Sequence, residues 1–318
     1  MTQQLADLLR DLQHAPDLTT ADRLTLLSDL DADGLRDLKQ AWPNLSAERR
    51  LTLLTQLRRL GDDRIELTFE KVSRFALTDP APEVRRQAIG NLWECEDPAL
   101  VVPLSEALSA DTDPSVREAA ASALGQFVFL GEVQRVPEGQ RRVAEERLLH
   151  AACHDSESAV RLAGLEALGF SSRPEVPALI EAAYRTGEER QVHSALVAMG
   201  RSANATWGPA VTAELASPAP LLRLVAARAA GELDLRAAVP TLVELLEDVS
   251  EDVRRASIWS LGELGGQQAE RALQSLLRRK PPQDEVALLE EALENLAFVD
   301  GTRDFLMLDF DDDVDDEH

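Results

Sequence analysis

The chain has 318 residues, of which 44% are hydrophobic and 4% aromatic, and its 33 basic and 57 acidic side chains give a formal net charge of −24. This balance repels nucleic-acid phosphates and anionic membranes, so neither is expected as a partner, and it favours a partner with a basic surface. Two cysteines without a spacing pattern do not form a disulfide framework, and no apolar stretch is long enough to span a membrane. The N-terminus also lacks the apolar segment of a signal peptide, so we expect a cytoplasmic protein.

Residues 1–45 are expected to form an N-terminal helical cap. The segment Arg23–Leu30 (RLTLLSDL) reappears 27 residues later as Arg50–Leu57 (RLTLLTQL). Between the two copies, residues 33–42 have the pattern of a short helix, which Pro43 would end. Short, atypical units at an end cover the open core of a stacked array. We therefore expect the array itself to occupy residues 46–299.

One sequence motif of about ten residues recurs through this array. Strong copies begin with Val-Arg at Val84, Val116, Val160 and Val253, and weaker copies begin at Val192, Leu222 and Val286. Successive copies start 32, 44, 32, 30, 31 and 33 residues apart. Apolar and small residues follow each start at helical spacing, and a glycine nine residues after four of the starts is predicted to end the helix.

A second apolar run precedes several of these helices, with Val-Pro in its first turn, as at residues 101–108, 176–183 and 239–246. Each unit is thus a pair of helices that cannot bury its apolar face alone, so neighbouring units must stack. A period near thirty predicts an all-α protein, a right-handed α-solenoid of antiparallel helix pairs. The 44-residue interval is expected to hold an inserted loop near 129–141, either a functional decoration or a tolerated ornament.

An aspartate stands six residues before each arginine of the strong copies. The pairs are Asp79 with Arg85, Asp111 with Arg117, Asp155 with Arg161, and Asp248 with Arg254. With an aspartate and an arginine six residues apart, the chain resembles the HEAT repeat. Its Val-Arg-x-x-Ala and Leu-Gly motifs resemble the variety of that repeat named after phycobilisome lyases. The resemblance implies a ladder of hydrogen bonds between successive repeats, so we expect the arginines to be structural and not an anion-binding row. Gly187 and Ser217 replace the aspartate before His193 and Arg223, which leaves the ladder in question at those two joints.

Positions two, six and ten residues after each start share one face of the second helix. The resemblance implies that the second helices line the concave side of the array. A mixture of apolar residues with both charge signs suits a protein or peptide partner, and the alternative is that the apolar members contact adjacent repeats. The candidate partner-binding residues, with Phe170 and Trp259 the strongest, are Arg86, Glu118, Leu162, Glu166, Phe170, Leu224, Arg228, Arg255, Trp259 and Glu263.

The last segment, residues 300–318, is predicted to be an acidic and flexible tail. It holds nine acidic side chains and one basic side chain. One interpretation is a disordered solubilising tail. The other is a linear motif whose apolar residues enter a groove while the acids meet a basic rim. The residues of that motif would be Phe305, Leu306, Leu308 and Phe310.

No enzymatic motif such as G-x-S-x-G, a P-loop, G-x-G-x-x-G or H-E-x-x-H occurs in the chain. His150, Cys153 and His154 share one helical face, but no further ligands stand at a supporting spacing. We therefore expect no catalytic residues, no cofactor and no metal. The predicted function is a non-enzymatic scaffold that binds a protein or peptide on the concave face. The alternative that the resemblance implies is a bilin-lyase-like chaperone or enzyme for chromophore attachment.

Overall fold

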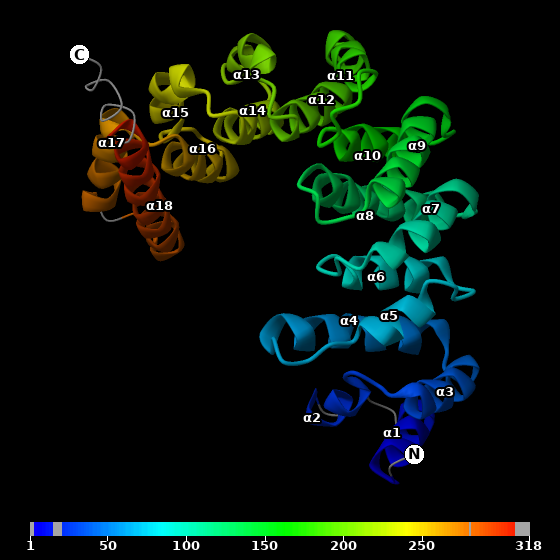
Figure 1. Cartoon of the computed structure of the whole chain (residues 1–318). Helices are drawn as coiled ribbons and strands as arrows, with labels where there is room; N and C mark the ends of the chain where they lie inside the picture. Colours follow the sequence, from blue (N-terminus) through cyan, green and yellow to red (C-terminus); the bar gives the residue numbers. More distant parts are fainter. Residues whose placement is uncertain (1–2, 15–20, 280, 309–318) are drawn as a thin grey trace, which may run out of the picture. The chain divides into compact units, whose positions relative to one another are not determined.

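The computed structural model describes residues 3–14, 21–279 and 281–308, and within these ranges the chain forms the helices α1–α18 and short 3-10 turns, with no strand (Figure 1). No helix in the described ranges is long and apolar enough to cross a membrane. The chain divides into two compact units, residues 1–168 and 169–318. The predicted all-α solenoid is confirmed, because successive helix pairs stack within each unit.

Unit 1 begins with short helices and continues as stacked helix pairs. Its helices are α1 (Gln3–His14), α2 (Ala21–Leu24), α3 (Ala32–Ala41), α4 (Ala47–Asp63), α5 (Glu70–Ala76), α6 (Pro82–Asn91), α7 (Val101–Ala110), α8 (Pro114–Glu132), α9 (Glu138–His154) and α10 (Ser158–Leu168). The second helices of the pairs, α4, α6, α8 and α10, pack side by side and are called B helices below. The first helices, α5, α7 and α9, are called A helices and pack on the B layer.

Unit 2 repeats the same plan. Its helices are α11 (Val176–Arg185), α12 (Glu189–Arg201), α13 (Gly208–Glu214), α14 (Pro220–Glu232), α15 (Val239–Leu245), α16 (Glu251–Leu264), α17 (Gln267–Arg278) and α18 (Gln283–Leu308). The B helices α12, α14, α16 and α18 form a layer, and the A helices α11, α13, α15 and α17 pack on it. Leucine, valine and alanine supply almost all of the buried side chains, as a chain poor in aromatic residues requires.

The first helices of unit 1 share one apolar core with the start of the repeats. Leu8 and Leu12 of α1, Leu27, and Leu38 of α3 have no or almost no exposed surface and pack in the same cluster as the leucines of α4. The Trp42 ring lies against Phe75 of α5, with ring centroids 5.5 Å apart. The described residues before α4 thus cover the apolar face of that helix which no earlier repeat covers.

The glycines near the ends of the B helices do more than end a helix. The prediction that they end it is confirmed at Gly169, which directly follows α10, but α8 continues for seven residues beyond Gly125 and α16 for two beyond Gly262. A Cβ on Gly125 would lie 3.0 Å from the Cβ of Ala167, and a Cβ on Gly262 would lie 3.0 Å from the Cα of Ala292. These glycines therefore let adjacent B helices approach closely. The same close approach occurs at Gly169, Gly200 and Gly231.

The prediction of an inserted loop near 129–141 is wrong, because most of these residues are helical. The extra residues of this interval lengthen the helices, since α8 has 19 residues and α9 has 17. Only residues 133–137 connect the two helices. The run of phenylalanine, valine and leucine at residues 127–130 remains apolar, which allows α8 to continue beyond Gly125.

The last helix passes the predicted start of the tail. Helix α18 runs to Leu308, and the carboxylate of Asp300 accepts the backbone N–H of Gly266 at 3.1 and 3.0 Å. The backbone at Phe305, Leu306 and Leu308 is helical, whereas Phe310 lies outside the described residues. Residues 300–308, which were predicted as the start of the tail, therefore continue the last helix.

Candidate functional site

The recurring arginine connects its own repeat to the next one. The Nε and Nη2 atoms of Arg85 donate to the two carboxylate oxygens of Asp111, each at 2.7 Å. Its Nη1 donates to the backbone oxygen of Asp79, six residues earlier, at 2.8 Å. The carboxylate partner therefore belongs to the following repeat, and the aspartate six residues back contributes its backbone carbonyl.

The full set of contacts recurs at Arg117 and Arg223, and Arg50 and Arg254 each make a single contact to a carboxylate. Arg117 donates to Asp155 at 2.8 and 2.9 Å, and its side chain is only 12% exposed. At the N-terminal end, Arg50 lies 3.3 Å from the carboxylate of Asp79, which also accepts the Trp42 indole N–H. Toward the next repeat, Arg254 meets Glu285 instead of an aspartate, at 3.0 Å.

Arg161 and Arg223 also donate to the backbone carbonyl six residues earlier. The Nη1 of Arg161 donates to the backbone oxygen of Asp155 at 2.7 Å. Arg223 donates to Asp248 at 2.7 and 2.8 Å and to the backbone oxygen of Ser217 at 2.9 Å. Because any residue can supply a backbone carbonyl, the joint at Arg223 tolerates the missing aspartate at 217.

Two aspartates of the ladder, Asp155 and Asp248, have their pKa lowered by the arginine that they bind. The guanidinium of Arg117, bonded to both carboxylate oxygens, lowers the pKa of Asp155 against the opposing effect of burial. Arg223 lowers the pKa of Asp248 in the same way. A carboxyl whose pKa is lower in the folded state stabilises that state at a pH above its unfolded pKa, and this contribution is lost as the pH falls through the folded pKa.

We expect the ladder to weaken in acid. The unfolded aspartate has a pKa of about 3.9, so the contribution of Asp155 is complete at neutral pH and falls away below about pH 4. Urea unfolding at several pH values should therefore give a difference in stability between wild type and Arg117→Ala that shrinks as the pH falls below about 4. A difference that stays constant down to pH 2 or so would show that the charge of Asp155 does not contribute.

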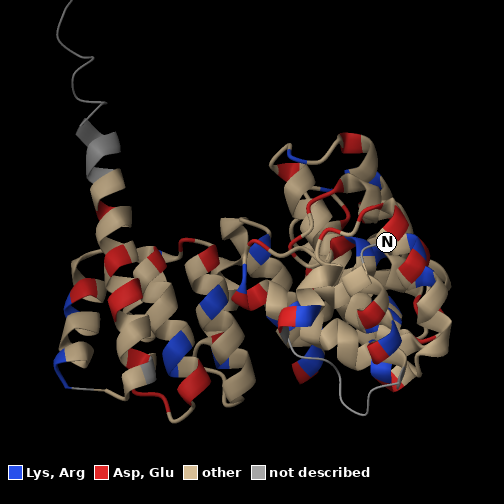
Figure 2. Ribbon diagram, turned by 90° about the horizontal axis from the view of Figure 1, so that it is seen from below, with Lys and Arg blue, Asp and Glu red and all other residues tan. Residues whose placement is uncertain are grey.

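Nine of the candidate partner-binding residues lie on B helices, and Phe170 lies in the turn after α10. Basic and acidic positions are interspersed along the helices of both units (Figure 2). In unit 1, Arg86 and Glu118 are exposed, and Leu162 and Glu166 are partly buried. In unit 2, Arg228 is exposed, and the partly buried members are Phe170, Leu224, Arg255, Trp259 and Glu263. We call these ten residues the B-helix surface.

Several members of the B-helix surface also contact a neighbouring repeat. The guanidinium of Arg201 lies over the Phe170 ring, 5.0 Å from its centroid. The Trp259 ring lies so close to Gly231 that a Cβ there would be 2.9 Å from Cζ3. These side chains therefore contact adjacent repeats, as the alternative interpretation holds, while each keeps part of its surface exposed.

A groove between α12 and α14 brings two of the predicted residues together. Its cavity of about 290 Å³ is lined by Leu224, Arg228 and Glu232 from α14 and by His193 and Arg201 from α12, among others. Glu232 is exposed over part of its side chain, but its carboxylate packs over Gly200. Burial of that carboxylate raises the pKa of Glu232, against the opposing charges of Arg201 and Arg228.

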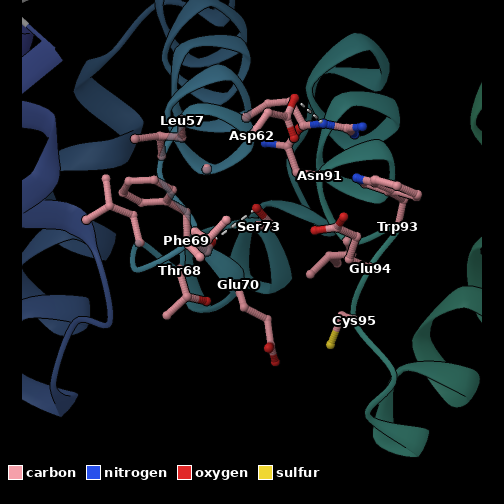
Figure 3. Close-up of a pocket in the computed structure, with 15 residues that line it drawn as sticks. Leu57, Asp62, Thr68, Phe69, Glu70, Ser73, Asn91, Trp93, Glu94 and Cys95 are labelled. Carbon is pink, nitrogen blue, oxygen red and sulfur yellow. Dashed lines mark hydrogen bonds and ion pairs between the residues drawn. The ribbon is translucent and has the colours of Figure 1, made fainter. Parts of the chain in front are cut away.

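A second pocket, in unit 1, was not found from the sequence (Figure 3). It has a volume of about 260 Å³ and lies between the end of α4, the start of α5 and the end of α6. Its lining includes Leu57, Phe69 and Leu92, which are buried, and Ile65 and Trp93, which are 97% and 52% exposed. The available signal was a bulky apolar residue next to a charged one in a connecting segment, as in Asp-Arg-Ile-Glu and Leu-Trp-Glu.

Metal ligands do not gather in the part of the chain that the structure describes: no group of three or more His, Cys, Asp and Glu side chains there is arranged to hold an ion. The rings of His150 and His154 lie 5.0 Å apart, and the neighbouring Cys153 is exposed. In the pocket of unit 1, burial raises the pKa of the Cys95 thiol, which disfavours the reactive thiolate.

A family of helical repeats matches two parts of this chain. The family model for HEAT repeats matches residues 72–138 and 208–294. No curated protein matches the sequence.

Several solved structures are similar to this chain. The complex of CpcE and CpcF of phycocyanin lyase from Nostoc is 21% identical, with a TM-score of 0.49, over 72% of this chain and 95% of that chain. Human deoxyhypusine hydroxylase is 20% identical, with a TM-score of 0.33, over 93% and 96%. Importin beta is 14% identical, with a TM-score of 0.47, over 92% and 46%. All three TM-scores lie below 0.5, so these similarities assign no family or function to this chain.

Proposed function

Because the family model for HEAT repeats matches residues 72–138 and 208–294, we propose that the chain is a non-enzymatic scaffold or adaptor that binds a protein or peptide partner on its B-helix surface. The observation that carries the proposal is the groove between α12 and α14, where Leu224 and Arg228 share one cavity. Stacked repeats present such positions again and again along one layer, and this extended surface is the part of a solenoid that partners use.

The composition of the surface supports a protein partner. Arginine, tryptophan and other aromatic residues are enriched at the centres of protein interfaces. In unit 2 the B-helix surface combines Trp259 and Phe170 with Arg228 and Arg255. Each aromatic ring is partly buried against its own repeats, so it is held in place before a partner arrives, which lowers the entropy lost on binding.

The net charge of the chain indicates which kind of partner surface it attracts. With a formal charge of −24, the protein attracts cationic surfaces at long range and repels anionic ones. Glu118, Glu166 and Glu263 place acidic groups within the B-helix surface. We therefore propose a partner with a basic surface, and a cytoplasmic location in which Cys95 and Cys153 stay reduced. The bilin-related alternative stays a prediction from the resemblance in sequence.

Reversing one charge in the groove tests the proposal. Arg228→Glu is expected to weaken binding of a partner purified with the wild-type protein by about tenfold or more, since it removes the guanidinium and its hydrogen-bond donors from the centre of the groove. Isothermal titration calorimetry with that partner measures the change. Arg271→Glu, on the exposed side of the A helix α17, is the matched control and should leave the affinity unchanged. An equal loss of affinity in both variants would show that net charge, and not the B-helix surface, determines binding.

A further inference from the structure

The pocket of unit 1 has features of a binding site that the B-helix surface does not share. We propose that the pocket between α4, α5 and α6 binds a peptide segment of a partner protein in which a lysine or arginine stands beside a bulky apolar residue. This inference deepens the proposed function, because it names a second contact site and the chemistry of the segment that occupies it.

The pocket offers an apolar side chain a place to bury. Its inner wall consists of Leu57, Phe69 and Leu92, which are 0%, 8% and 5% exposed. Ile65 and Trp93 stand at its rim with much of their surface in water. Large apolar side chains that remain exposed around a cavity mark interaction sites, since a ligand that covers them removes that surface from water.

The size of the cavity favours a side chain over a cofactor. Its volume of about 260 Å³ is below the range of roughly 300–1,000 Å³ that is typical of small-molecule sites. A single leucine or phenylalanine side chain fits such a space. The rest of the ligand must then lie outside, over the rim formed by Ile65 and Trp93.

The charges around the pocket favour a cation beside that apolar group. The lining contains one basic side chain, Arg58, and three acidic ones, Asp62, Glu70 and Glu94. Arg58 is already engaged, because its Nε lies 3.3 Å from Asp62 and its Nη1 donates to the backbone oxygen of Gly90. Glu70 pairs with Arg74 at 2.6 Å.

Glu94 is the acid that remains available. It is exposed at the rim, and no basic side chain in the described ranges forms an ion pair with it. The C-terminal ends of α4 and α6 also lie at this pocket, and a helix C-terminus carries partial negative charge. A lysine or arginine of a ligand would meet Glu94 in a field that already favours positive charge.

Trp93 adds a second attraction for the same cation. The guanidinium of Arg58 already lies over its ring, 5.4 Å from the centroid, which shows that the ring is accessible to cations in this geometry. About half of the side chain remains exposed. A basic side chain of the ligand can therefore contact both Trp93 and the adjacent Glu94, while its apolar neighbour enters the cavity.

A peptide selection tests the inference without a known partner. The full-length protein is immobilised and a random peptide library is selected on it, and the enriched peptides are synthesised and titrated by fluorescence anisotropy. We expect them to carry lysine or arginine next to leucine, phenylalanine or another bulky apolar residue. Trp93→Ala and Glu94→Lys should each weaken their binding at least tenfold. The matched controls Val102→Ala and Glu106→Lys, at exposed positions of the A helix α7, should not change it.

Several outcomes would overturn the inference: no enriched peptide, peptides without basic residues, or binding that survives Glu94→Lys. The variant Arg228→Glu separates this test from that of the proposed function. Peptides that lose affinity with Arg228→Glu but not with Trp93→Ala occupy the B-helix surface, which supports the proposed function and contradicts the pocket. Circular dichroism melting curves of each variant establish that the fold is intact.

Discussion

Arg117→Ala is expected to lower the free energy of unfolding by about 3 kcal/mol, because it leaves a buried carboxylate without its partner. The side chains of Arg117 and Asp155 are only 12% and 10% exposed, so water reaches Asp155 poorly after the substitution. The backbone oxygen of Asp111 loses its donor as well. Urea unfolding followed by circular dichroism measures the change.

The control for this prediction lies on the neighbouring A helix. Arg147→Ala removes an exposed arginine of α9 and should change the stability by less than about 0.5 kcal/mol. Replacing both partners, as in Arg117→Met with Asp155→Leu, should recover much of the lost stability, since no unpaired charge remains. Equal effects of Arg117→Ala and Arg147→Ala would contradict the structural role of the ladder.

Gly125→Ala is expected to destabilise the protein by about 1–3 kcal/mol, because the added methyl group forces two packed helices apart. Its Cβ would lie 3.0 Å from the Cβ and 3.1 Å from the Cα of Ala167 on α10, and backbone atoms there cannot move aside cheaply. Thermal and urea unfolding measure the effect, and the loss should appear as a lower midpoint.

Gly90 provides a control of the same chemistry in the same unit. It lies in α6, where a Cβ would meet no atom within 4 Å. Gly90→Ala should therefore be neutral or stabilise the protein by up to about 1 kcal/mol, because alanine loses less entropy in a helix than glycine does. If both substitutions destabilise equally, close approach of the B helices is not the reason for Gly125.

Much of the fold could be predicted because the repeat is written in local patterns. The Val-Arg starts mark the first turns of B helices, and Val-Pro marks the first turns of A helices at Val176 and Val239. The function of Gly125 could not be predicted in this way, since a glycine that ends a helix and one that admits a neighbouring helix look alike in sequence. Only the position of Ala167 on the next B helix distinguishes them.

The candidate site was predictable only in part. The spacing along each B helix correctly brought Leu224 and Arg228 to one face, and the structure places them in one groove. Glu232 lies on the same face of α14, four residues after Arg228, whereas Arg201 joins the groove from α12, a relation that no local pattern records. The pocket beside Trp93 arises from a connecting segment and three helix ends, whose convergence depends on the tertiary packing.

Site-specific photocrosslinking tests the central claim, that partners bind on the B-helix surface. A photoreactive amino acid is placed at position 224 in the groove and, in a separate protein, at the exposed position 244 on the A helix α15. Irradiation in the presence of a copurified partner should give a crosslinked product from position 224 and little or none from position 244. A product from position 244 alone, or equal products from both, would contradict the assignment of the B-helix surface.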